Sequence, residues 1–184
     1  MEGARHLDAE RKVPVVTRLL VIVVIDVVVW GVWSTLAGYI GHRVPARWLD
    51  HDSWVFRLRG SERDGSFYVR HTAIKKWKRF LPEAGDVFND GFHKRHLRSR
   101  DRNYMERFVI ETRRAEFTHY LVMAVAPFFF LWNPWWLGLV MVAYAVLANV
   151  PCVAAQRYNR ARFLRVLAQL PPSSANPTRI GDTE

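Results

Sequence analysis

The chain has 184 residues, half of them hydrophobic, and a formal net charge of +10. This length suits one domain with tails, and the hydrophobic residues gather in two blocks, as in a membrane protein rather than a soluble one. The charge therefore indicates a membrane surface or anionic ligands, and nucleic acid is not expected as a partner. One cysteine, Cys152, excludes an intramolecular disulfide.

The first apolar block follows a charged head over residues 1–12. Residues 19–40 form a run of 22 whose only charge is Asp26. At about 1.5 Å per residue this run reaches roughly 33 Å, enough to cross a hydrocarbon core of about 30 Å. It is too long for a signal peptide, so an uncleaved transmembrane helix is predicted over residues 13–41. Asp26 is expected to face a neighbouring helix or another copy of the chain.

The middle segment, residues 42–110, is strongly basic and is expected to lie at the cytoplasmic surface. Apolar and basic residues alternate over 54–59, and turn residues follow, which predicts a short β-hairpin that ends at residues 67–69. Ile74 and Trp77 have helical spacing, typical of a short helix on lipid headgroups. The polar stretch that follows, from Arg102, predicts a helix that continues into the second apolar block.

The second apolar block, residues 117–155, has 39 residues and is too long for one span. An Asn-Pro turn signal at 133–134, flanked by tryptophans, predicts a helical hairpin. Its transmembrane helices are assigned to 111–131 and to 135–165, the second with a cytoplasmic extension, and the tail over 171–184 is expected to be disordered. The predicted fold is an all-α integral membrane protein with about three transmembrane helices.

The distribution of charge predicts the orientation of these helices. Three spans place the middle segment and the C-terminus on one side, with 18 Lys and Arg residues between positions 41 and 114 and five after Ala155. Basic residues favour the cytoplasmic side, so a multi-pass protein of the cell membrane is expected, with its N-terminus outside and its C-terminus in the cytoplasm.

Two polar residues on the hairpin should lie at the same depth. His119 precedes Trp132 by about 20 Å of helix, and Asn149 follows Trp135 by about 21 Å. Since the two helices are antiparallel, His119 and Asn149 are expected to lie close together near the cytoplasmic edge, one turn or two from the polar residues 156–160. The sequence therefore predicts a polar site between the helices.

Two interpretations of this site are open. Glu116 and His119 share a helix face, so Glu116 is placed to orient His119 as a general base, while Arg113 and Arg157 are placed to clamp a phosphate or carboxylate. Alternatively, the carboxylates pair with arginines only to hold the hairpin together. That second set comprises Glu111, Glu116, Arg113, Arg114, Arg157 and Arg160.

Weaker patterns do not change this picture. His96 and Asp101 have the His-x4-Asp spacing of glycerolipid acyltransferases, and residues 81–85 resemble the substrate loop of that family, but the two stand in reversed order, which favours coincidence. His96 stays a second candidate base. Glu116-x-x-His119 is half of a di-iron signature without its second half, so no metal site and no cofactor are predicted.

Three stretches of the chain resemble the glycosyl-4,4'-diaponeurosporenoate acyltransferase family. The resemblance covers about residues 67–165 and implies transfer of a fatty acyl group onto a sugar hydroxyl of a glycosylated carotenoid acid. The matching stretches are Lys75-Lys76-Trp77-Lys78 with Leu81-Pro82-Glu83, Glu111-Thr112-Arg113-Arg114-Ala115-Glu116 through His119, and Ala148-Asn149-Val150-Pro151 followed by Gln156-Arg157-Tyr158-Asn159-Arg160 and Arg162.

In such a reaction His119 would take the proton of the attacking sugar hydroxyl, and an amide or a guanidinium would stabilise the oxyanion. The expected partners are a fatty acyl donor (acyl-CoA or acyl carrier protein), a glycosylated isoprenoid lipid and membrane lipids. The catalytic candidates are His119, Glu116 and Glu111. The substrate-binding candidates are Arg113, Arg114, Asn149, Gln156, Arg157, Asn159, Arg160, Lys76 and Trp77. Rival hypotheses are an acyltransferase for another glycolipid and a non-catalytic scaffold.

Overall fold

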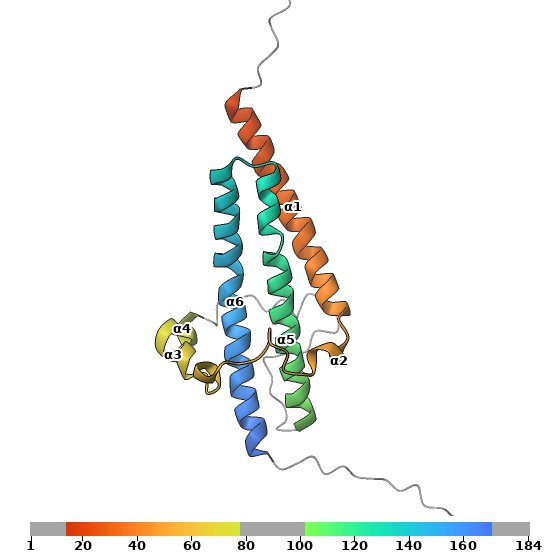
Figure 1. Ribbon diagram of the computed structural model, residues 1–184, viewed down its shortest axis with the longest axis vertical. Helices are drawn as coiled ribbons and strands as arrows, with labels where there is room; N and C mark the ends of the chain where they lie inside the picture. Colours follow the sequence, from red (N-terminus) through yellow and green to blue (C-terminus); the bar gives the residue numbers. More distant parts are fainter. Residues whose placement is uncertain (1–13, 78–101, 171–184) are drawn as a thin grey trace, which may run out of the picture.

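The computed structural model describes residues 14–77 and 102–170, which contain helices and no β-strand (Figure 1). The head over 1–12, the patterns at 81–85 and 96–101 and the tail over 171–184 lie outside the described residues. The elements in chain order are α1 (Val15–Arg43), α2 (Ala46–Leu49), the 3₁₀-helix η1 (Gly60–Glu62), α3 (Ser66–Thr72), α4 (Ile74–Trp77), α5 (Arg102–Met123), the 3₁₀-helix η4 (Ala126–Leu131) and α6 (Trp135–Gln169).

Helices α1 and α6 are long and apolar enough to cross a membrane. Most apolar side chains of α1 face outward; Val15 and Leu20, for example, are 72% and 61% exposed. Helix α6 has 35 residues and continues through Pro151. Such an outward apolar surface suits contact with lipid. The prediction of an all-α protein is confirmed for the described residues, and two of the three predicted spans have the length and hydropathy that a membrane crossing needs.

Helix α1 is joined to the turn between η4 and α6 by its one internal carboxylate. Asp26 is only 2% exposed, and its Oδ1 accepts hydrogen bonds from Trp132 Nε1 (2.8 Å) and Asn133 Nδ2 (2.9 Å). One turn further along α1, Trp30 stacks on Phe129 with ring centroids 5.0 Å apart. The expectation that Asp26 serves helix packing is therefore confirmed.

Helices α5 and α6 lie side by side and antiparallel (Figure 1). Helix α5 begins at Arg102, as the polar stretch before the second apolar block predicts. The helix expected over 111–131 is not one continuous α-helix: α5 ends at Met123, and η4 continues to Leu131. Pro127 explains the change, because its nitrogen has no hydrogen to donate to the carbonyl of Met123.

The β-hairpin predicted between residues 54 and 69 is wrong. This segment folds as turns, η1 and α3, which pack beside the lower half of α6 in Figure 1. Gly65 has φ of +71°, and the side chain of Asp64 accepts a hydrogen bond from Ser66 N, so the chain turns directly into α3. Tyr68 of α3 is then buried against Tyr158, an apolar contact that overrides the alternating pattern.

Candidate functional site

His119 and Asn149 face each other across α5 and α6, as their predicted depths require. His119 Nδ1 lies 2.9 Å from Asn149 Oδ1. Asn149 Nδ2 donates a hydrogen bond to Ala145 O at 2.9 Å, which fixes the amide with its oxygen toward the imidazole. An amide oxygen only accepts hydrogen bonds, so Nδ1 of His119 must carry the hydrogen. In the neutral ring this leaves the lone pair on Nε2, the atom that a general base uses.

Glu116 holds the two helices together one turn below His119. Its Oε1 accepts hydrogen bonds from Arg157 Nη1 (2.7 Å) and Tyr120 Oη (2.7 Å), and its Oε2 accepts one from Arg160 Nη1 (2.6 Å). Glu116 is fully buried. Both oxygens are thus committed to cations, and the side chain that holds Nδ1 of His119 is Asn149. The ion pairs expected between Glu116 and the arginines of α6 are confirmed.

Glu62 of η1 joins this network through Arg157. Arg157 Nη2 donates to Glu62 Oε2 at 2.6 Å, and Tyr68 Oη donates to Glu62 Oε1 at 2.5 Å. Burial alone would raise the pKa of Glu62, but the hydrogen bonds, first of all from Arg157, lower it to about 2. Two carboxylates therefore balance two guanidiniums, those of Arg157 and Arg160. A buried group of opposite charges is stable only when paired in this way.

Arg113 anchors the loop after α2. Its Nη1 donates to Leu49 O at 2.8 Å, and its Nη2 pairs with the carboxylate of Asp52. Its guanidinium is 6% exposed. The sequence placed Arg113 among the candidate site residues. In the structure its ion-pair partner is Asp52, which lies in a segment without helical or strand periodicity.

Arg114 covers the C-terminal end of α1. Its Nη1 donates to the carbonyl oxygens of Gly41 (2.9 Å) and Val44 (2.5 Å), and its Nε pairs with Glu111 at 3.1 Å. A cation at a helix C-terminus satisfies carbonyl groups that the helix itself leaves unpaired. The expected Glu111–Arg114 pair is confirmed, and it positions α1 against α5.

The other substrate-binding candidates lie farther along α6 and on α4. Gln156 is partly buried, and its Oε1 has no donor among residues 14–77 and 102–170. Asn159 is partly buried three residues later. Lys76 is exposed, and Trp77 donates its indole hydrogen to Thr72 O at 2.6 Å. The structure thus brings α4 against α6, where Trp77 packs on the cluster formed by Tyr68, Ile74, Ala155 and Tyr158.

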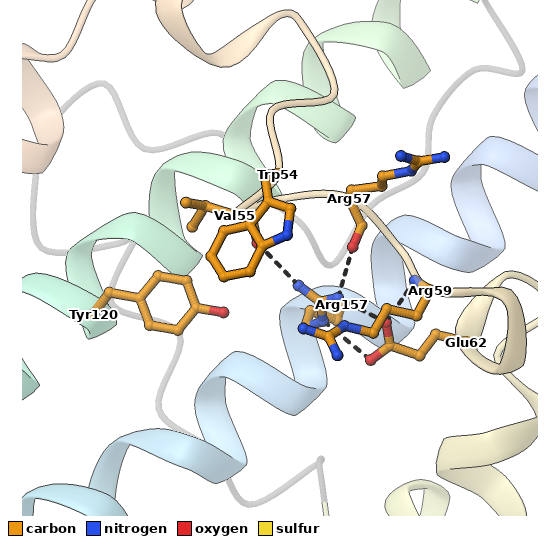
Figure 2. A pocket seen from close by; sticks show the side chains of 7 residues that line it. All are labelled: Trp54, Val55, Arg57, Arg59, Glu62, Tyr120 and Arg157. Atoms are coloured by element: carbon orange, nitrogen blue, oxygen red, sulfur yellow. Dashed lines mark hydrogen bonds and ion pairs between the residues drawn. The ribbon is translucent and has the colours of Figure 1, made fainter.

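A cleft of 490 Å³ opens beside the buried ion pairs (Figure 2). In Figure 2 Tyr120 extends from α5 and Arg157 from α6, and Trp54 extends from the loop segment drawn above them. The lining residues are Trp54, Val55, Arg57, Arg59, Glu62, Tyr120 and Arg157. Sequence reasoning missed all of them except Arg157. For Tyr120 a signal exists, because it stands four residues after Glu116 on the same helix face.

Comparison with known proteins gives the family. The model of the glycosyl-4,4'-diaponeurosporenoate acyltransferase family matches residues 45–169. Proteins of that name from Staphylococcus aureus strains bovine RF122 / ET3-1, USA300 and NCTC 8325 / PS 47 are each 29% identical to this chain over 139 residues, which is 75% of this chain and 83% of the relative. No solved structure matches the chain. The resemblance of the sequence motifs is thereby confirmed, and the chain belongs to the glycosyl-4,4'-diaponeurosporenoate acyltransferase family of enzymes.

Proposed function

We propose that this acyltransferase esterifies a sugar hydroxyl of a glycosylated carotenoid acid with a fatty acyl group. The names of its relatives supply the reaction and the acceptor. The observation that carries the proposal is the hydrogen bond between His119 and Asn149, because it fixes the imidazole tautomer that takes a proton. An acceptor with a long apolar body also suits a site beside the two apolar helices α1 and α6.

The proposed reaction passes through one tetrahedral intermediate. The sugar oxygen attacks the carbonyl carbon of a thioester while Nε2 of His119 removes the hydroxyl proton. The carbonyl π electrons move to oxygen, and a guanidinium or an amide stabilises that charge. The intermediate then expels the thiolate, which recovers the proton from His119, so that the products are the ester and a free thiol.

The buried charges position this histidine without touching the reacting atoms. Glu116 joins α5 to α6 through Arg157 and Arg160, at 2.7 and 2.6 Å. Glu111, with Arg114, fixes the end of α1 on the same helix. We assign these residues positioning roles, with His119 as the base, and keep Gln156 and Asn159 as predicted substrate contacts.

We further propose that the apolar half of α5, with η4, forms a third span. It runs antiparallel to α6 in Figure 1, and the tryptophans at the turn are those typical of a membrane interface. Trp135 and Trp136 are exposed. The basic middle segment and the C-terminus then lie in the cytoplasm. This topology is tested by placing a single cysteine at either end of the chain and labelling it on intact cells with a reagent that does not cross the membrane. Labelling of the C-terminal cysteine from outside would overturn the topology.

The function is tested with membranes that contain the full-length protein. Membranes are supplied with a fatty acyl-CoA and with either a glucosylated carotenoid acid or a glucosyl diacylglycerol, and the esters are identified by mass spectrometry. Membranes that contain the His119→Ala variant in equal amount are the control. Ester formation on the carotenoid glycoside alone supports the proposal, whereas acylation of only the diacylglycerol glycoside would contradict the acceptor, and equal activity of the control would contradict the base.

A further inference from the structure

A second cavity shares part of its lining with the cleft of Figure 2. It has a volume of 280 Å³ and is lined by Trp54, Arg57, Leu58, Arg59, Gly60 and Arg63. Trp54, Arg57 and Arg59 line both cavities. The two therefore form one continuous surface, called the basic trough here, that leads from Tyr120 and Arg157 to Arg63.

Three arginines of the basic trough are not balanced by acidic side chains. Arg57, Arg59 and Arg63 are exposed, and none of them forms an ion pair within residues 14–77 and 102–170. Two carboxylates flank Arg63 in the chain: Glu62 pairs with Arg157, and Asp64 accepts a hydrogen bond from Ser66 N. Like charges concentrated in a concave surface attract anions and bind phosphate groups with particular strength.

An aromatic side chain stands beside these arginines. Trp54 is 83% exposed although it lines both cavities. In the view of Figure 2 its indole ring lies between Tyr120 and Arg57. An exposed indole next to arginines is a surface on which a nucleobase stacks. The basic trough thus combines phosphate-binding groups with a base-stacking group.

We propose that the basic trough binds acyl-CoA as the acyl donor. This inference rests on the proposed acyl transfer and names the class of thioester that supplies the acyl group. The phosphates of CoA bind Arg57, Arg59 and Arg63, and the adenine stacks on Trp54. The pantetheine arm then follows the cleft to Tyr120 of α5. The exposed indole favours CoA over a carrier protein, because a carrier protein brings phosphopantetheine without a nucleobase.

The test measures CoA binding and acylation kinetics on the full-length protein in nanodiscs of zwitterionic lipid. The double variant Arg57→Ala with Arg59→Ala is compared with a control of equal charge, Arg18→Ala with Arg47→Ala, whose arginines are exposed outside the trough. We expect the Kd for CoA to rise about tenfold or more in the first variant and to stay unchanged in the control. The KM for acyl-CoA should rise in parallel, with kcat and the KM for the acceptor preserved.

A second arm uses Trp54→Ala with two ligands, CoA and 4′-phosphopantetheine. Loss of affinity for CoA but not for 4′-phosphopantetheine supports stacking of the adenine. Equal affinity for CoA in wild type and in the Arg57→Ala, Arg59→Ala variant would overturn the proposal. It would also be overturned if that variant lost only its binding to anionic lipid vesicles, or if acyl transfer occurred only with acyl carrier protein as the donor. Because CoA binding is measured without turnover, a failure of acyl transfer on every acceptor would refute the proposed function and leave the binding result readable.

Discussion

His119 and Asn149, 30 residues apart in the chain, meet with 2.9 Å between Nδ1 and Oδ1. The contact joins α5 to α6 and depends on both helices, since the Asn149 amide is itself fixed by the carbonyl of Ala145. It orients the imidazole and determines which nitrogen carries the hydrogen. A neutral amide does this without adding a buried charge between the two helices.

Replacement of His119 by Gln should lower the rate of ester formation by about 10²- to 10⁴-fold, the usual contribution of a general base. Glutamine keeps an amide that can reach Asn149, so the amount of protein in the membrane should stay near that of wild type. Both quantities are measured on the same membranes, by mass spectrometry of the ester and by immunoblot. A variant with normal activity would remove His119 from the mechanism, and one that disappears from the membrane would make it a packing residue.

Replacement of Asn149 separates orientation from chemistry. Asn149→Ala removes the acceptor for Nδ1, so both tautomers become accessible, and kcat should fall about tenfold or more. Asn149→Asp keeps an acceptor oxygen and should retain more activity than Asn149→Ala. The comparison is made at saturating substrate, and equal kcat values for the two variants would contradict an orienting role.

Replacement of Glu116 by Gln should destabilise the protein, because it leaves Arg160 buried without its carboxylate. Loss of one partner of a buried ion pair typically costs about 3–5 kcal/mol. In this variant Arg157 keeps its pair with Glu62, and Arg160 is the buried charge left unpaired. The double variant Glu116→Gln with Arg160→Gln removes that charge, so it should recover part of the lost stability. Thermal unfolding in detergent micelles measures both.

The control for Glu116 is Glu106→Gln, which breaks an exposed pair with Arg102. Glu106 is 51% exposed, so the change should cost less than about 1 kcal/mol. Equal melting temperatures for the Glu116 and Glu106 variants would show that the buried network does not stabilise the helix pair.

The sequence predicted those parts of the site that follow helical geometry. Depth along an antiparallel hairpin depends on residue count alone, so the meeting of His119 with Asn149 was predictable from their distances to the turn. Pairing of Glu116 with Arg157 followed from the same count. The 3₁₀ segment after Met123 was not predicted, although Pro127 marks it, because an apolar run does not reveal where its helix type changes.

Contacts made by the middle segment were not predictable. Glu62 and Asp52 stand among turn residues without periodicity, and their partners, Arg157 and Arg113, lie 95 and 61 residues away. The alternation over residues 54–59 indicated a strand, yet the segment is held by its carbonyl groups, which accept hydrogen bonds from buried arginines of α6. Such irregular backbone depends on its partners and not on local propensity.

The stability of the protein should fall in acid through Glu62. Its pKa is about 2 in the folded protein, against an ordinary value of 4.5, so the unfolded chain binds the proton more readily between these values. The contribution of Glu62 is therefore complete above pH 4.5 and is lost as the pH falls toward 2. In melting curves recorded from pH 6 to pH 3, Glu62→Gln should be less stable than wild type at pH 6, and this difference should shrink in acid. A constant difference would contradict the role of the Glu62–Arg157 pair.

Asp26 should hold α1 to the turn of the hairpin. Replacement by Leu removes the acceptor for Trp132 and Asn133, and leaves the buried amide of Asn133 without its partner, at a cost of about 1–3 kcal/mol. Trp132→Phe is the control, because it deletes a single donor and keeps an aromatic ring, so it should cost less. Limited proteolysis in micelles measures the release of α1, and we expect cleavage in the loop after α1 to accelerate in the Asp26 variant first. If Asp26→Leu resists proteolysis as well as wild type does, packing of Trp30 on Phe129 is sufficient to hold α1, and the carboxylate serves another purpose in the bilayer.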